Sequence, residues 1–250
     1  MLNLIINADD FGYSRAVNYG IIDAHQKGVL TSTTCMTNMP AVEHAYDLGK
    51  QYKSLGIGIH LSLTCGRPLL KNHQTLVDAD GNFKKLHHYQ EKFHVDEEEL
   101  YQEWKAQIEA FLDSGLIPTH VDSHHHINNL EPILPVFIQL AKEYGLPVRN
   151  NFSQESVDAS LTTTDHFEYN PEILLADTET ILHHYKGAET VEIMCHPAYL
   201  DKFIMDNSSY ATPRLEELET LTHPTTKSKL MNSEHFKLIS FYDLKERVNE

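Results

Sequence analysis

The chain has 250 residues, which is enough for one α/β domain with a sizeable hydrophobic core. Its 20 basic and 36 acidic residues give a net charge of −16, and this balance argues against nucleic acid and anionic membrane surfaces as partners. No apolar stretch approaches the ~20 residues of a membrane span. The three cysteines are odd in number and far apart, which argues against a disulfide framework and favours a cytoplasmic protein.

Strand and helix patterns alternate along the chain, and no repeat, low-complexity tract or linker interrupts them. Strands are expected at residues 2–7, 29–37, 58–63, 118–124, 147–150, 190–195 and 238–241. Helices are expected from the N-cap Ser14 to Gly28, from Pro40, over 96–113, over 132–144 and up to about Tyr185. Residues 66–95 lack clear periodicity apart from a hairpin turn at Asp80-Gly81, and residues 151–170 are expected to form an extended loop.

This alternation predicts a single domain over residues 1–250 with a mainly parallel sheet, because parallel strands need crossover connections that are usually helical. About seven strands suit an α/β barrel or a barrel-like fold. In such folds the loops that follow the strands meet at one edge of the sheet, where functional sites are built.

Carboxylates and imidazoles lie at the ends of four predicted strands. Asp9 and Asp10 follow the first strand, His60 lies in the third, the run 119–126 contains four histidines, and His196 follows the strand at 190–195. Each has a simpler explanation when taken alone: the two aspartates could cap the next helix, and His60 could be a satisfied core residue. Their shared position at one edge predicts a single site.

The two aspartates are expected to have different roles. Neighbouring residues in an extended strand point to opposite sides, so Asp9 and Asp10 are not expected to chelate one ion together. One would be a metal ligand and the other a hydrogen-bonded base. His196, held by the following proline, is expected to be a general acid or, alternatively, a turn residue.

The histidine run is expected to supply one ligand. On an extended strand His120 and His124 would stand about 13 Å apart, so both cannot bind one ion. Strand alternation would place His120, Asp122, His124 and His126 on one face. A histidine between 124 and 126 is therefore the expected ligand, with His120 or Asp122 supporting it or the surrounding structure.

One carboxylate and two imidazoles would leave coordination positions open for water and substrate, as in catalytic metal sites. A cation in such a site activates water and polarises a carbonyl group, while a carboxylate and a histidine nearby can move protons. These properties predict amide hydrolysis. The sequence contains no Gly-x-Ser-x-Gly elbow, P-loop or dinucleotide-binding glycine fingerprint.

Four segments resemble the YdjC-type carbohydrate deacetylases, the group that includes chitooligosaccharide deacetylase: residues 7–12 (NADDFG), 58–61 (GIHL), 119–126 (THVDSHHH) and 195–197 (CHP). Ser208-Ser209-Tyr210 and the stretch that begins at Arg214 extend this resemblance over nearly the whole chain. The resemblance implies a distorted (β/α) barrel, a homodimer, and removal of acetyl groups from N-acetylglucosamine-containing oligosaccharides such as chitobiose, in some cases phosphorylated.

The resemblance also implies roles for individual residues. Asp10, His60 and His124 would hold the metal, Asp9 would be the base and His196 the acid. The family implies Mg²⁺, whereas these ligand types would equally suit Zn²⁺.

Outside these motifs, Arg149 is a candidate for contact with substrate hydroxyls or a phosphate, although a surface salt bridge is its expected role. Two further functions compete with metal-dependent N-deacetylation. One is a metal-dependent phosphoesterase on a similar barrel, which release of phosphate rather than acetate would reveal. The other is a non-catalytic sugar- or metal-binding protein. Such a protein turns over no substrate, so Asp9→Asn would leave all of its measurable activity unchanged.

Overall fold

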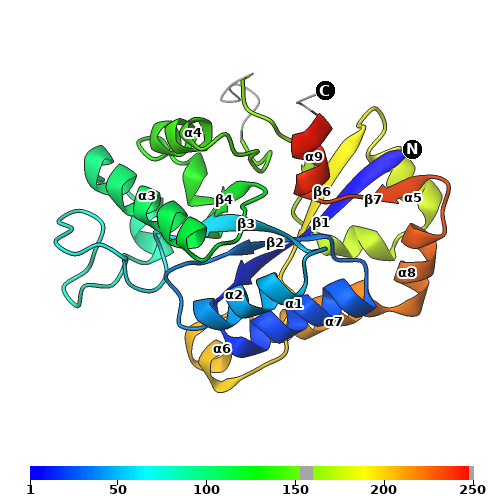
Figure 1. The fold of residues 1–250 in the computed structure, drawn as a ribbon, viewed down its shortest axis with the longest axis horizontal. Coiled ribbons are helices and arrows are strands. Elements are labelled where there is room, and N and C mark those ends of the chain that lie inside the picture. The colour runs from blue at the N-terminus through cyan, green and yellow to red at the C-terminus, as the bar shows by residue number, and fades with distance from the viewer. Residues whose placement is uncertain (153–159, 248–250) are drawn as a thin grey trace.

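A computed structural model describes residues 1–152 and 160–247, and in this part of the chain all seven strands join one sheet with parallel pairing (Figure 1). The strands are β1 Leu2–Phe11, β2 Ser32–Cys35, β3 Gly56–Leu61, β4 Val121–Ser123, β5 His166–Glu168, β6 Thr190–Cys195 and β7 Phe236–Leu238. Their order is β4-β3-β2-β1-β6-β5, and β7 pairs with the first residues of β1.

Helices cover the outside of the sheet, which curls into part of a barrel (Figure 1). They are α1 Arg15–Lys27, α2 Val42–Gln51, α3 Glu97–Asp113, α4 Leu134–Glu143, α5 Thr178–His184, α6 Lys202–Asn207, α7 Thr212–Thr222, α8 Pro224–Met231 and α9 Phe241–Arg247. None of these helices is long and apolar enough to cross a bilayer. The predicted single-domain α/β fold, a distorted barrel of parallel strands, is confirmed.

Local capping chemistry explains where two predicted helices begin. Ser14 Oγ accepts a hydrogen bond from the backbone N–H of Val17 at 3.2 Å, and Asp96 accepts one from Glu99 at 3.0 Å. These side chains satisfy backbone donors that have no partner within a helix. By contrast, α2 begins at Val42, two residues after the expected Pro40.

Three short elements differ from the prediction. Residues 147–150 form no strand, and only Val148 makes an isolated bridge, to Val121. β5 falls inside the predicted loop 151–170, of which residues 153–159 lie outside the described part of the chain. The predicted strand 238–241 overlaps β7 only at Leu238, because Ser240 donates hydrogen bonds to Asp243 and α9 begins at Phe241. Strands of three residues carry too little periodicity to be recognised.

The two faces of β1 have different environments. Leu4, Ile6 and Ala8 lie in the main hydrophobic cluster with residues of the surrounding helices. Ile5, on the other face, packs with residues of the last turn and α9, including Phe241. Side chains from alternate positions therefore fill the inside of the curled sheet, as in closed α/β barrels.

One layer of this interior depends on a glycine. The His120 ring stacks on Phe241, with 3.7 Å between ring centroids and 11° between planes. A Cβ added at Gly58 would lie 2.5 Å from His120 Nδ1 and 2.7 Å from its carbonyl oxygen. The absence of a side chain at position 58 lets β3 and the residues before β4 approach each other.

Gly58→Ala is therefore expected to lower the free energy of unfolding by about 1–3 kcal/mol, as overpacked cores do. The backbone oxygen of His120 cannot move aside without disturbing the sheet. Urea denaturation followed by circular dichroism measures this difference. An unfolding midpoint equal to that of the wild type would contradict the close approach.

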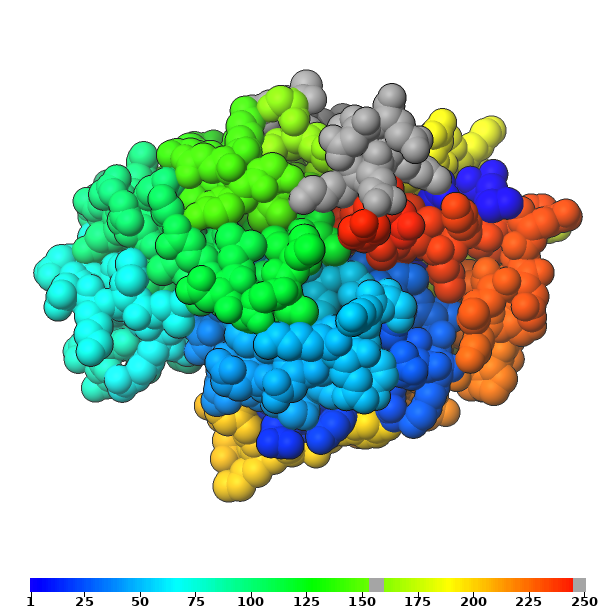
Figure 2. All heavy atoms as spheres, in the orientation of Figure 1, coloured from blue at the N-terminus to red at the C-terminus, as the bar shows by residue number. Residues whose placement is uncertain are grey.

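Residues 66–95 leave the sheet after β3 and return at α3, and Figure 2 shows this cyan segment as a projection at one side of the molecule. Two carboxylates one turn apart on α3 hold it. Glu103 accepts backbone hydrogen bonds from residues 69 and 70, and Glu99 accepts them from residues 74 and 75. The segment is thus attached to the body of the protein although most of it lacks regular structure.

Candidate metal centre

A bulge in β1 brings Asp9 and Asp10 to the same side. Ala8 pairs with Thr33 and Phe11 with Cys35, so β1 has one residue more than β2 in this interval. Asp10 lies in this bulge and adopts a left-handed backbone conformation, with φ of +71°. The expectation that the two carboxylates point to opposite sides is therefore wrong, because it assumed a regular strand.

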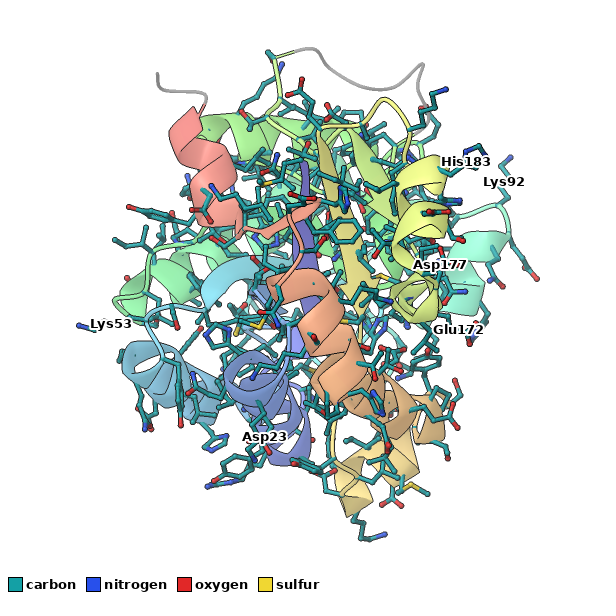
Figure 3. The ribbon with its side chains drawn as sticks, turned by 90° about the vertical axis from the view of Figure 1, so that its right-hand side faces the viewer. Asp23, Lys53, Lys92, Glu172, Asp177 and His183 are labelled. Atoms are coloured by element: carbon teal, nitrogen blue, oxygen red, sulfur yellow. The ribbon has the colours of Figure 1, made fainter. Side chains whose placement is uncertain are left out.

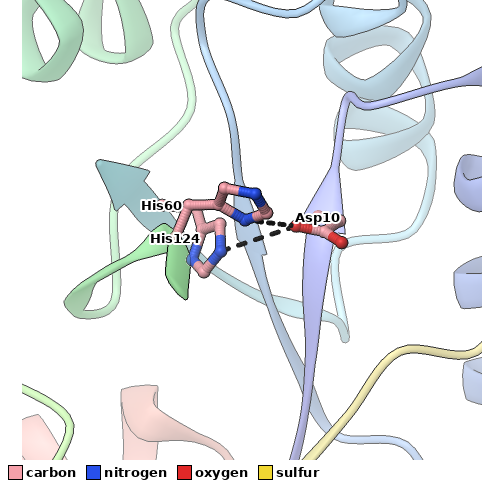
Figure 4. Close-up of side chains that lie close together, drawn as sticks. All are labelled: Asp10, His60 and His124. Carbon is pink, nitrogen blue, oxygen red and sulfur yellow. Dashed lines mark ion pairs between the residues drawn. The ribbon is translucent and has the colours of Figure 1, made fainter. Parts of the chain in front are cut away.

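Asp10, His60 and His124 form a buried cluster whose potential ligand atoms lie within 4.8 Å of one another (Figure 4). Asp10 Oδ1 is 3.6 Å from His60 Nε2 and 3.1 Å from His124 Nδ1. Among the described residues this oxygen accepts no well-directed hydrogen bond. A buried oxygen without such a partner, facing two imidazole nitrogens, fits a site for a cation.

His60 is oriented for this role by Asp122 of β4. His60 Nδ1 donates to Asp122 Oδ1 at 2.6 Å, and Thr34 Oγ1 donates to the other carboxylate oxygen at 3.3 Å. This contact leaves His60 Nε2 free to face the two aspartates, 3.6 Å from Asp10 Oδ1 and 3.9 Å from Asp9 Oδ2. Metal-binding histidines commonly have such a carboxylate on their second ring nitrogen, and the supporting role expected for Asp122 agrees with this geometry.

The histidine run turns sharply after β4. The strand ends at Ser123, and His125 and His126 have φ of +58° and +53°, in the left-handed region. The predicted alternation of histidines on one extended strand is therefore wrong beyond residue 123. The turn lets three successive imidazoles line one cavity, while His120 stays in the interior below.

Arg149 lies beneath Asp9 at the centre of a charged network. Its Nη1 and Nη2 donate to the two oxygens of Asp9 at 2.8 and 2.6 Å, Nη2 lies 2.9 Å from Asp122, and Nε donates to Glu192 at 2.9 Å. The side chain is completely buried and does not line the cavity. This position departs both from the expected surface salt bridge and from the alternative of a contact with substrate.

Helix α7 contributes two residues that sequence analysis did not assign. Arg214 Nη2 donates to Asp10 Oδ2 at 2.6 Å. Glu217, three residues later, accepts a short hydrogen bond from the backbone N–H of His196 and lies 4.0 Å from its Nδ1. Both are buried charged residues on one helix face. The YdjC-like stretch that begins at Arg214 was the sequence feature that could have indicated their presence at the site.

Nearby charges determine the protonation of the cluster. Burial raises the pKa of Asp9, but Arg149 together with His60 and His196 outweighs this effect and holds the pKa below its usual range. Burial also raises the pKa of Asp10, and here Arg214 and His124 outweigh it. Both carboxylates therefore stay ionised at neutral pH and supply the negative charge that a bound cation requires.

The cluster opens into a cavity of about 520 Å³. Asp9 and His196 flank the cluster there, and His196 Nε2 lies 3.9 Å from Asp9 Oδ2. The walls come from segments far apart in the sequence, including Lys85, His87 and Tyr210. The structure thus brings together five of the six residues that were expected at the site and places the sixth, Arg149, directly below them.

Comparisons with known proteins agree with this arrangement. A family described as YdjC-like protein matches residues 3–232. A carbohydrate deacetylase of Clostridium beijerinckii is 43% identical and covers 97% of this chain and 100% of its own length. Another, of Halalkalibacterium halodurans, is 44% identical over 88% of this chain and 95% of its own length.

A solved structure from Enterococcus faecalis V583, described as a cellobiose-phosphate cleavage protein, superposes with a TM-score of 0.85. It is 37% identical, and the alignment covers 97% of this chain and 98% of that one. The match therefore extends over sequence, fold and length. The chain belongs to the YdjC-like family.

Proposed function

We propose that the chain, as a single domain over residues 1–250, removes N-acetyl groups from N-acetylglucosamine-containing oligosaccharides with the help of a divalent cation. The observation that carries this proposal is the Asp10, His60 and His124 cluster, with Asp9 and His196 beside it in one cavity. Relatives named carbohydrate deacetylases, at 43% and 44% identity, support the same reaction.

Asp10, His60 and His124 would hold the cation, since one potential ligand atom of each lies within 4.8 Å of the other two. A divalent cation there would polarise the acetyl carbonyl group and make a water molecule more acidic. The family resemblance favours Mg²⁺. Two imidazoles and one carboxylate are a donor set that Zn²⁺ accepts readily, whereas Mg²⁺ prefers oxygen ligands.

The protein's own side chains would move the protons. Asp9, which the guanidinium of Arg149 fixes through two hydrogen bonds, would accept a proton from the attacking water. His196 would donate a proton to the departing amine, and Glu217 would hold it in place through the backbone N–H. Arg149 would act by positioning Asp9 rather than by touching substrate, because its donors are directed at carboxylates.

The substrate proposal follows the cavity and the relatives. A volume of about 520 Å³ is within the range of small-molecule sites. An oligosaccharide such as chitobiose, with or without a phosphate, is the substrate class that we propose. We also propose that the protein works in the cytoplasm and that it forms a homodimer. Sedimentation equilibrium tests the oligomeric state.

The decisive experiment measures acetate and phosphate release from a panel of acetylated and phosphorylated amino sugars. We expect acetate release that is lost after dialysis against a chelator and restored by one divalent cation, with metal analysis of the purified protein identifying which. Phosphate release without acetate would favour the phosphoesterase. Binding of sugar without any product would favour a non-catalytic protein.

A further inference from the structure

A second group of metal-ligating side chains lies outside the cavity, at the edge of the sheet. His166 and Glu168 come from β5, which ends the strand order, and His184 comes from the last turn of α5. One potential ligand atom of each lies within 4.8 Å of the other two, and His184 Nε2 is 3.3 Å from Glu168 Oε2. We infer that these three side chains form a binding site for a second divalent cation of the Zn²⁺ type.

The local structure favours this convergence. Residues two apart on a strand share one face, so His166 and Glu168 project together toward α5. The carboxylate of Glu168 is already oriented, because the hydroxyl of Tyr185 donates to Oε2 at 3.1 Å and the backbone N–H of Asn170 donates to Oε1 at 2.9 Å. Little rearrangement is needed to present three donor atoms to one ion.

The donor set selects the class of cation. Two imidazoles and one carboxylate suit Zn²⁺, Ni²⁺ or Cu²⁺ better than Mg²⁺ or Ca²⁺, which prefer oxygen. The side chain of His184 is 50% exposed and that of Glu168 17%, so an ion can enter from solvent and keep water as a fourth ligand. The site shares no residue with the Asp10, His60 and His124 cluster.

The site is connected to the cavity through the residue between its two strand ligands. Phe167 points to the opposite, buried face of β5, where its ring lies 4.9 Å from the guanidinium of Arg149 and 5.8 Å from the ring of His126. A cation that joins β5 to α5 would hold in place the strand that supports these residues. Its role is therefore structural, at a distance from the reacting groups.

The test counts Zn²⁺ equivalents bound to metal-free full-length protein by equilibrium dialysis at micromolar free Zn²⁺. His184→Ala and His166→Ala are each expected to bind one equivalent fewer than the wild type. His183→Ala is the matched control, since His183 is exposed on the same helix (Figure 3) and belongs to no described ligand group. In the wild type, Zn²⁺ is expected to slow amide exchange in residues 166–168, and His184→Ala is expected to remove this effect.

Unchanged stoichiometry in His184→Ala and His166→Ala would overturn the inference, as would an equal loss in His183→Ala. The same experiment distinguishes the edge site from the proposed catalytic cation site in the cavity. A wild type that binds a single equivalent, lost in His184→Ala, would support the edge site and contradict the cavity site. An equivalent lost in His60→Gln and kept in His184→Ala would report the cavity site alone.

Discussion

Asp9→Asn is expected to lower kcat for acetate release by about 10²–10⁴-fold, the usual contribution of a general base. The amide keeps the size of the carboxylate and one acceptor oxygen for Arg149, but it cannot take a proton from water. Asp122 and Glu192 still accompany the buried guanidinium, so the fold is expected to persist. Steady-state kinetics, with circular dichroism to verify folding, measure the effect.

Cation binding separates this role from that of a ligand. Asp9→Asn is expected to bind the cation nearly as the wild type does, because Asp10, His60 and His124 remain. Asp80→Asn, in the exposed turn of the 66–95 segment, is the matched control and is expected to leave kcat unchanged. A kcat within a few-fold of the wild type would place the base elsewhere, and loss of the cation would make Asp9 a ligand.

Arg149→Met is expected to lower the free energy of unfolding by about 3–5 kcal/mol, or to prevent folding, because it leaves buried carboxylates without their counter-charge. The guanidinium lies against three buried carboxyl groups, those of Asp9, Asp122 and Glu192. Methionine fills a similar volume and supplies no charge. Urea denaturation, with the unfolding slope compared between variants, measures the loss.

Two further variants distinguish charge from geometry. Arg149→Lys keeps the charge but not the planar fork that binds Asp9 through two donors, so it is expected to recover only part of the stability. Arg67→Met removes an exposed arginine and is expected to change the free energy of unfolding by less than about 0.5 kcal/mol. A loss below about 1 kcal/mol in Arg149→Met would contradict the central role of the network.

The site could be predicted where one short segment carries both the strand and its functional residue. His60 and His196 each lie at the end of a six-residue strand whose apolar pattern is recognisable, and parallel strands bring such ends to one edge. The conformation at those ends could not be predicted in the same way. The left-handed turn at His125 and His126 and the bulge at Asp10 depend on contacts with partners distant in the sequence.

The burial of Arg149 could not be predicted from the sequence either. Its neighbours in sequence suggest a polar loop after a strand, and nothing local reports that Asp9, 140 residues away, lies against it. An arginine is most often exposed, so a surface role was the natural expectation. Only the curling of the sheet places it inside with its carboxylates.

The amino-acid sequence by itself indicated the alternation of strands and helices, the family, and the side chains that could bind a cation or move a proton, since hydrophobic periodicity and short motifs are local properties. The tertiary structure decided which of these side chains meet. It turned Asp10 toward His60, buried Arg149 under Asp9, and brought Arg214 and Glu217 from α7 to residues some 200 and 20 positions earlier in the chain. Such contacts arise from the curling of the sheet and the packing of helices around it, which no single segment encodes.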